Sequence, residues 1–136
     1  MRSEFNIHIV LLAAGLLLAV PAALAFAHQD KLAGADWVLA GEAGSRAPFL
    51  RFEGGRVAGL GGCNRFGGTY DFDGDRLSFS PLAATRMACP GEIMKAEQAF
   101  FDMLAKVKGV SLTGETLVLL DGDGKALARF DKRLAQ

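Results

Sequence analysis

Short apolar segments separated by turns rich in glycine and aspartate dominate the chain from residue 35 onward. Within most of these segments apolar and polar residues alternate, which is the period of a half-buried β-strand. The connections are too short for crossover helices, so we predict antiparallel pairing. The predicted strands are residues 37–39, 49–52, 56–60, 69–72, 76–80, 116–120 and 125–130. Turns are predicted at residues 41–45, 54–55, 73–75 and 121–124.

One stretch departs from this alternation and has the spacing of an amphipathic helix. We predict a helix over about residues 91–108, with Glu92 in its first turn and Lys106 and Lys108 in its last, an order that complements the helix dipole. Gly109 follows as the expected left-handed C-terminal cap. The apolar stripe consists of Ile93, Ala96, Phe100, Met103, Leu104 and Val107, and the polar face of Lys95, Gln98 and Asp102.

Together these elements predict an α+β fold. We expect a curved antiparallel sheet of about seven or eight short strands, open-barrel-like, packed on the one amphipathic helix. The apolar face of that helix either belongs to an ordinary core or borders a cavity filled by a lipid or another ligand. A cavity of several hundred cubic ångströms between helix and sheet would favour ligand binding. A solid core with an exposed apolar patch would favour a protein partner.

Residues 1–27 have the pattern of an export signal, with an apolar run over residues 9–20 that ends at a proline followed by small residues. The run of about 12 residues is shorter than the roughly 20 that span a bilayer. We expect cleavage near residue 25 or 27 and a single domain over residues 28–136, soluble in the periplasm. An uncleaved membrane anchor is the alternative. No cysteine follows the cleavage region, which argues against a lipid anchor.

Charged residues are balanced, with 15 Lys and Arg against 15 Asp and Glu. A nucleic-acid partner would need a basic excess on one face, so we expect none. The histidines are His8, inside the expected signal, and His28, at the start of the expected domain. Without an imidazole in the folded body, Ser-His-Asp catalysis, Cys-His catalysis and histidine metal sites are excluded. We expect neither an enzyme nor a bound cofactor.

The two cysteines, Cys63 and Cys89, are expected to form a disulfide, because an exported chain matures in an oxidising compartment. Closing a loop of about 27 residues would stabilise the fold by about 3.5 kcal/mol through lost chain entropy in the unfolded state. Two buried free thiols or a redox pair are the alternatives. A redox pair is usually spaced Cys-x-x-Cys, a spacing that this sequence lacks.

Residues 61–70, GGCNRFGGTY, are too rich in glycine for an ordinary strand interior and too rich in specific side chains for a plain linker. Asn64 among glycines favours a left-handed or turn conformation in which its amide bonds nearby backbone groups. A strand bulge fixed by Asn64 is one interpretation. The other is a binding site in which Asn64 and Arg65 contact a ligand or a partner.

The aspartate-rich turns have some of the residues of a calcium-binding loop. Asp71, Asp73 and Asp75 begin like an EF-hand loop, but Arg76 stands at the sixth position instead of glycine and Leu82 at the twelfth instead of glutamate. The match fails. Hairpin chemistry explains this run and the later DGDG sequence, so we expect no metal site.

GGCNRFGGTY, followed by LAATRMACPGE before the helix, resembles the META domain, the HslJ-like heat-shock family. The matching positions are Gly62, Cys63, Asn64, Gly68 and Tyr70, then Thr85, Met87, Ala88 and Cys89, with Trp37 as an early tryptophan. The resemblance implies a compact antiparallel sheet wrapped around one helix, in envelope proteins of bacteria that are often periplasmic or lipid-anchored. The family is linked to heat shock, stress or antibiotic tolerance and, in some members, to secretion or virulence. No catalytic residues are established for it.

We therefore expect a non-enzymatic, monomeric envelope protein that acts as a stress-related binding or structural module. Its partner would be another envelope protein or a hydrophobic small molecule. A carrier of small hydrophobic ligands and an inhibitor or secretion-assisting module are the alternatives. Besides the Cys63–Cys89 disulfide, the residues with an expected structural or binding role are Gly62, Asn64, Arg65, Gly68, Tyr70, Thr85 and Met87.

Overall fold

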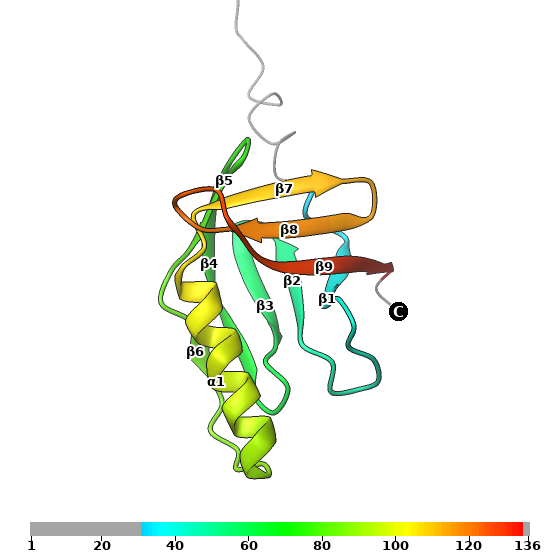
Figure 1. The fold of residues 1–136 in the computed structure, drawn as a ribbon, viewed down its shortest axis with the longest axis vertical. Helices are drawn as coiled ribbons and strands as arrows, with labels where there is room; N and C mark the ends of the chain where they lie inside the picture. Colours follow the sequence, from blue (N-terminus) through cyan, green and yellow to red (C-terminus); the bar gives the residue numbers. More distant parts are fainter. Residues whose placement is uncertain (1–30, 135–136) are drawn as a thin grey trace, which may run out of the picture.

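The computed structural model describes residues 31–134 of the chain. The export signal predicted for residues 1–27 lies outside the described residues and stays a prediction. Figure 1 shows the elements, which in chain order are β1 (Ala35–Leu39), β2 (Phe49–Glu53), β3 (Arg56–Leu60), β4 (Arg65–Asp73), β5 (Arg76–Phe79), β6 (Ala83–Ala84), α1 (Gly91–Ala105), β7 (Gly109–Thr113), β8 (Thr116–Leu120) and β9 (Ala126–Leu134).

The strands form one antiparallel sheet that closes on itself. The order is β3-β2-β1-β9-β8-β7-β5-β4, and β4 pairs back to β3, so eight strands make a closed barrel. β6 pairs with β4 alone and lies outside this ring. The antiparallel sheet and the single helix were predicted and are confirmed. The expectation of an open-barrel-like sheet was wrong, because the ring is closed.

The length of β4 explains the closure. It runs from Arg65 to Asp73, well beyond the predicted segment of residues 69–72. One edge of β4 pairs with β3, while its other edge pairs with β5 and then with β6. The shortest ladder of the ring joins β5 to β7, where the N–H of Val110 donates to the carbonyl of Asp75 at 2.8 Å. A short segment identified by its pattern does not reveal a strand with two sets of neighbours.

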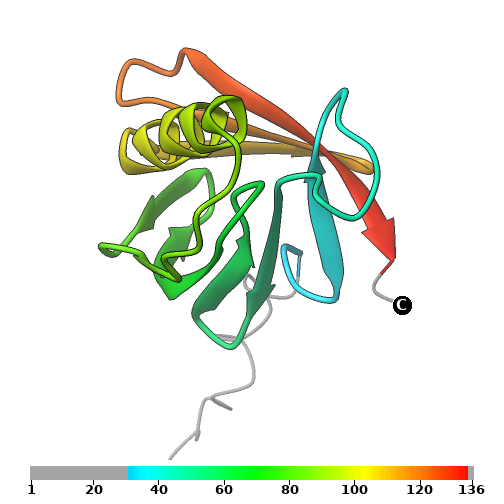
Figure 2. The ribbon, with the colours of Figure 1, turned by 90° about the horizontal axis from the view of Figure 1, so that it is seen from below.

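The helix α1 completes the core between two walls of the barrel. Figure 2 shows it lying between the strands β4 to β6 and the hairpin of β8 and β9. Its Phe100 ring centroid lies 6.1 Å from that of Phe66 on β4 and 6.3 Å from that of Phe130 on β9. The largest fully buried side chains of the barrel and helix are Leu32, Trp37, Leu50, Phe52, Val57, Leu77, Leu104, Val107, Leu117, Leu119 and Phe130. The helix is too short and too polar to cross a membrane, and the described residues contain no helix that could.

Each predicted strand overlaps an observed one, and residues 56–60 and 116–120 coincide with β3 and β8. The predicted turn at residues 54–55 joins β2 to β3. The sequence did not predict β6, which is only two residues long, or β7. The polar helix face of Lys95, Gln98 and Asp102 is exposed as predicted.

The predicted end of the helix was wrong, because α1 stops at Ala105 rather than at residue 108. The N–H groups of Lys106 and Val107 donate to carbonyls three residues earlier, which tightens the last turn. The last helical turn consequently holds no basic residue, whereas Glu92 does lie in the first turn.

The sheet draws the next residues out of the helical path. The N–H of Lys108 donates to the carbonyl of Leu120 at 2.9 Å, and the carbonyl of Lys108 accepts the N–H of Leu77 at 3.2 Å. Gly109 is therefore the first residue of β7, and its φ is not positive. The left-handed cap predicted at Gly109 does not form. Gly109 is a strand residue instead, with register partners on both β5 and β8.

Candidate functional site

Residues 61–64 form the turn of the hairpin between β3 and β4, and the predicted strand bulge is not there. Leu60 and Arg65 are register partners at the ends of the two strands. Between them, the N–H of Gly61 donates to the carbonyl of Asn64 at 2.9 Å. The register shift of the sheet lies instead between Leu119 and Leu120 of β8.

Within this hairpin turn, the left-handed conformation belongs to glycine. Gly62 has a φ of 119°, in the region that side chains rarely adopt. No non-glycine residue in the described part of the chain has a positive φ, so the turn conformation predicted for Asn64 is confirmed and the left-handed one is not.

Glu97 of α1 holds the hairpin turn from inside. Its Oε2 accepts the N–H of Cys63 at 2.8 Å and of Asn64 at 2.6 Å, and its Oε1 accepts Asn64 Nδ2 at 2.7 Å. The residue is only 4% exposed. Burial would raise the pKa of Glu97, but the hydrogen bonds from Asn64 and Cys63 together outweigh it and lower the pKa. Glu97 is thus an ionised acceptor that neutral donors, rather than a cation, stabilise.

The amide of Asn64 connects the same turn to residues 85–87. Its Oδ1 accepts the Thr85 hydroxyl at 2.9 Å and the N–H of Met87 at 2.6 Å. Its Nδ2, already bonded to Glu97, also lies 3.3 Å from the carbonyl of Met87. All four hydrogen-bonding positions of the amide are therefore used inside the protein. Asn64 is a buried connector, which favours the structural interpretation of this residue.

The predicted disulfide between Cys63 and Cys89 is confirmed, with 6.1 Å between their Cα atoms. Cys63 belongs to the hairpin turn, and Cys89 immediately precedes Pro90, the residue at the N-terminal cap of α1. The disulfide and the Asn64 amide fix the segment of residues 85–89 at two places. No free cysteine occurs among residues 31–134.

The remaining motif residues divide into packed and exposed ones. A Cβ on Gly68 would lie 2.7 Å from Leu82 Cδ2 and 2.9 Å from Ser80 Oγ, so a larger residue here would have to displace these two side chains. Tyr70 is buried with its ring 5.0 Å from that of Phe52, and burial raises the pKa of its phenol. Arg65 is exposed and forms no ion pair with another described residue.

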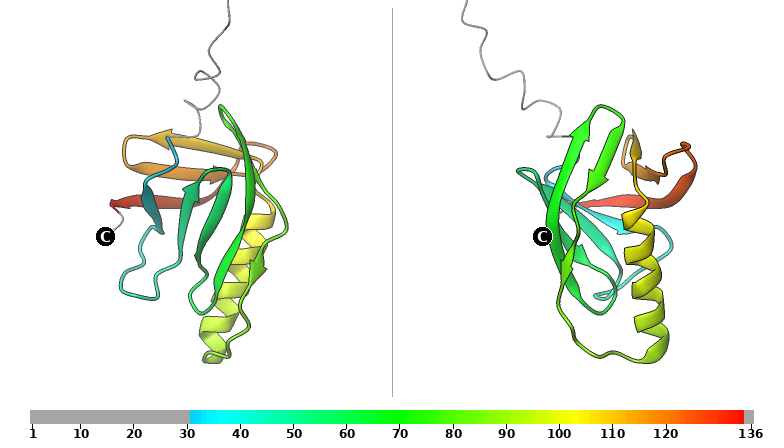
Figure 3. Two further views of the ribbon diagram at one scale, coloured as in Figure 1. Left: turned by 180° about the vertical axis from the view of Figure 1, so that it is seen from behind. Right: turned by 90° about the vertical axis from the view of Figure 1, so that its left-hand side faces the viewer.

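An apolar groove runs between α1 and the chain that leads from β5 to Ala88, and we call it the helix groove. One part of about 520 Å³ is lined by Phe79, Leu82, Ala84, Phe101 and Leu104, among others. A second part of about 570 Å³ shares Leu82, Ala84 and Phe101 with it and adds Met87, Met94 and Arg86. Figure 3, right, shows the chain segment that contains β6 running alongside α1.

Two exposed methionines border the helix groove. Met87 is 55% exposed and Met94 is 36% exposed. Within the described residues, the other large exposed apolar side chain is Leu134, at the end of β9. The exposed apolar surface thus concentrates along α1, where Met87 contributes its side chain to the groove while its backbone bonds Asn64.

A further hollow of about 590 Å³ is lined by both cysteines of the disulfide and shares Thr85, Met87 and Ala88 with the helix groove. Arg46, Leu60 and Arg65 also contribute to its lining. Arg65 is exposed there, whereas Asn64 is buried with its amide fully hydrogen-bonded, so the two side chains do not act as one binding pair.

The sequence did not single out Glu97, which the structure makes the centre of the site. A signal was available, because Glu97 lies four residues after Ile93 and three before Phe100, on the apolar stripe itself. No group of three or more His, Cys, Asp or Glu side chains within residues 31–134 is placed to hold a metal ion.

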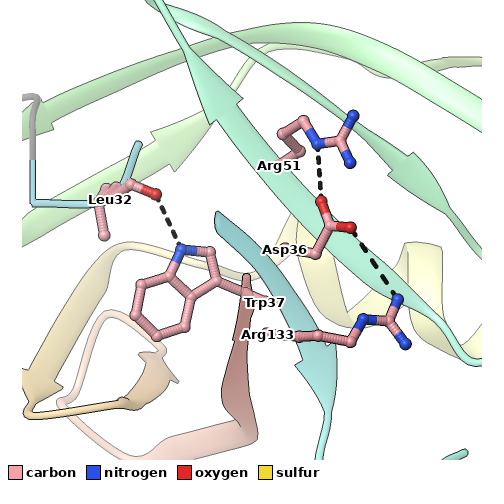
Figure 4. A network of polar contacts seen from close by, with 5 residues as sticks. All are labelled: Leu32, Asp36, Trp37, Arg51 and Arg133. Carbon is pink, nitrogen blue, oxygen red and sulfur yellow. Dashed lines mark hydrogen bonds and ion pairs between the residues drawn. The ribbon is translucent and has the colours of Figure 1, made fainter. Parts of the chain in front are cut away.

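A separate polar cluster lies at β1, on the far wall of the barrel (Figure 4). Asp36 Oδ1 lies 2.7 Å from Arg51 Nε, and Asp36 Oδ2 lies 3.9 Å from an Arg133 nitrogen. The neighbouring Trp37 donates its indole N–H to the carbonyl of Leu32 at 2.8 Å, which anchors the chain that enters β1. These residues contact neither Glu97 nor the helix groove.

The protein is therefore a closed antiparallel barrel completed by one helix. A disulfide links its hairpin turn to the helix start, and a buried glutamate holds the turn. The family model of the META domain matches residues 25–134, and the chain belongs to that family. Its structure is similar to an NMR structure of a protein from Burkholderia xenovorans, at 26% identity and a TM-score of 0.62, over 79% of this chain and 87% of the other. A second NMR structure, at 23% identity, shares the fold with a TM-score of 0.59 over 76% of this chain and 92% of the other. The curated proteins contain no match.

Proposed function

We propose that this META-domain protein is an exported, non-enzymatic binding module whose ligand lies in the helix groove. The observation that carries the proposal is the concentration of exposed apolar surface there, with Met87 and Met94 at its border. Methionine side chains are flexible and polarisable, and they suit surfaces that bind apolar partners. The groove also has the dimensions of a ligand site, at about 520 and 570 Å³ for its two parts.

The chemistry of the hairpin turn supports a binding role over catalysis. Glu97 is the buried acid nearest the motif residues, and its oxygens already accept three hydrogen bonds from Cys63 and Asn64. A general acid or base needs a pKa near neutrality, whereas these bonds lower the pKa of Glu97. The carboxylate is therefore suited to holding structure rather than to transferring protons.

Export and the link to stress rest on other observations. The signal-like pattern of residues 1–27 supports export to the periplasm, and the paired sequence motifs support a stress-related role through the resemblance to HslJ-like proteins. We infer a monomer that binds either another envelope protein or a hydrophobic small molecule. A carrier of small hydrophobic ligands is favoured by the apolar lining of the groove, and an inhibitor or secretion-assisting module remains compatible with the same surface.

Recovery of ligand from the envelope tests the proposal. The protein, expressed with its full N-terminal sequence, would be purified from envelope extract and analysed by native mass spectrometry for lipid and by affinity capture for protein. Met94→Glu, which places a charge at the border of the groove, should reduce the recovered ligand several-fold. Leu134→Glu is the matched control, because Leu134 is equally apolar and more exposed but lies on β9. Equal recovery from both variants and the unmodified protein would contradict a ligand site in the groove.

A further inference from the structure

We propose that the helix groove takes an extended peptide segment of a partner protein, which adds as a strand to the open edge of β6. This inference rests on the proposed function and specifies the class of ligand. Strand addition occurs where a sheet presents unpaired backbone groups beside pockets for alternate side chains. Both features meet along residues 83–88.

The register of β6 determines which backbone groups are free. Ala83 faces Gly67 and Ala84 faces Phe66 across the ladder with β4. The N–H of Thr85 donates to the carbonyl of Arg65 at 2.9 Å. Because the peptide groups of successive strand residues point to opposite sides, the N–H and C=O of Ala84, and of Arg86 after it, point away from β4.

The topology leaves this outer edge without a strand. β5 and β6 both pair with the same edge of β4. β5 has β7 on its other side, whereas β6 is the terminal strand of the sheet order. Past β6, the helix groove separates residues 82–88 from α1. A strand added to β6 would therefore lie in the groove, with α1 beyond it.

Hydrogen bonds and the disulfide hold the open edge in place without any ligand. Asn64 holds the N–H of Met87 at 2.6 Å, the hydroxyl of Thr85 bonds the same amide, and the disulfide fixes Cys89. A preformed edge loses little conformational entropy on binding, which favours a peptide ligand. This arrangement gives the buried Asn64 and Glu97 network a purpose beyond stability, since it holds the chain that follows β6 in place along the groove.

Hydrogen-bonding chemistry favours a peptide over an acyl chain. A hydrocarbon covering the groove would remove water from the Ala84 and Arg86 peptide groups without replacing its hydrogen bonds, which is costly. A peptide supplies N–H and C=O partners while its alternate side chains contact Met87, Met94 and Phe101. Arg86 lines the groove and forms no ion pair with another described residue, so an acidic side chain in the peptide would complement it.

Selection from a phage-displayed library of random linear peptides against the disulfide-bonded protein tests the inference. We expect the selected peptides to alternate apolar residues and to carry at least one Asp or Glu. A synthetic binder would be N-methylated at alternate peptide bonds in either of the two possible phases. One phase should weaken binding by about tenfold, because it removes the N–H groups that face β6, and the other should leave the affinity unchanged. Equal binding by both phases would overturn strand addition.

Two variants test the protein side of the edge. Ala84→Pro removes an N–H that the fold does not use and should weaken the peptide by about tenfold, whereas Ala84→Val keeps the N–H and should not. If Ala84→Pro does not fold, the two N-methylated peptides still test whether the ligand adds as a strand to β6. Dodecanoate serves as the lipid probe. Binding of dodecanoate with no peptide selected would overturn the inference while leaving a ligand-binding groove. Failure of every probe, together with no effect of Met94→Glu on ligand recovery, would overturn the proposed function as well.

Discussion

Two carboxylates, Asp36 and Glu97, are the buried acidic side chains of the described chain, and they are partnered in opposite ways. Asp36 on β1 faces cations on both neighbouring strands, because its register partners are Arg51 on β2 and Arg133 on β9. Both arginines are about half exposed. Glu97 instead faces three neutral N–H donors and forms no ion pair with another described residue.

This difference separates a half-exposed ion pair between strands, in which only the arginines reach solvent, from an internal connection. Asp36 joins strands that backbone ladders already join, so its removal leaves β1, β2 and β9 paired. Glu97 joins α1 to the hairpin turn, where no ladder is available, and Asn64 extends the connection to Thr85 and Met87. We therefore expect the two acids to differ sharply in the cost of their removal and in its dependence on salt and pH.

Glu97→Ala should have the largest effect and should lower the free energy of unfolding by about 4 kcal/mol, because it leaves buried N–H donors of Cys63 and Asn64 without acceptors. Urea denaturation measures the loss. Gln98→Ala is the matched control on the same helix, because Gln98 is exposed and should cost less than about 0.5 kcal/mol. A loss below about 1.5 kcal/mol for Glu97→Ala would show that Glu97 contributes no more to the free energy of unfolding than a surface acid does.

Loss of the disulfide should come next. The double variant Cys63→Ser with Cys89→Ser should lower the free energy of unfolding by about 3.5 kcal/mol through the larger entropy of its unfolded chain. The disulfide and Glu97 hold the same turn, so combining this variant with Glu97→Gln should give a non-additive loss. Combination with a substitution at Asp36 should be additive. Additivity in both cases would mean that the disulfide and Glu97 do not act on one structure.

The pH dependence of stability should distinguish Glu97 from the rest of the chain. The hydrogen bonds from Asn64 and Cys63 hold the folded pKa of Glu97 below its ordinary value of 4.5, so its contribution is fully present above about pH 4.5 and is lost as the pH falls through the folded pKa. Glu97→Gln cannot titrate and should lower the free energy of unfolding by about 2 kcal/mol at neutral pH, with a shallower decline in acid. Chemical denaturation between about pH 3 and 7 measures both effects. Parallel curves for the variant and the unmodified protein would contradict the lowered pKa.

The sequence predicted the local hairpins well and the closure of the barrel poorly. Turns at residues 54–55 and 121–124 sit between segments that alternate clearly, so short-range pattern sufficed there. β7 alternates too, but its first residue, Gly109, also suits a helix cap, and only the pairing of Lys108 with Leu77 and Leu120 decides between the two. Closure depends on such long-range pairing, which no local period encodes.

The candidate site shows the same division. An even cysteine number, in a chain whose first residues have the pattern of an export signal, was enough to predict the disulfide. The partners of Asn64 could not be predicted, because Thr85, Met87 and Glu97 are distant in sequence and two of the bonds involve backbone groups. Glu97 carried a positional signal on the apolar stripe, but the sequence prediction placed it on neither face of the helix. A charged residue at a stripe position indicates a buried hydrogen-bonding role.

The smallest effect should belong to Asp36. Asp36→Asn should lower the free energy of unfolding by about 1 kcal/mol in low salt, because an asparagine oxygen can still accept a hydrogen bond from Arg51 but loses the charge interaction. That loss should shrink in about 1 M salt, because Arg51 and Arg133 are about half exposed and open to counterions, whereas the loss from Glu97→Gln should not change. Asp73, the ion-pair partner of Arg76, is far more exposed than Asp36, so Asp73→Asn should cost still less. If salt instead reduced the cost of Glu97→Gln and not that of Asp36→Asn, the assignment of Glu97 to an internal connection and of Asp36 to a half-exposed ion pair would be reversed.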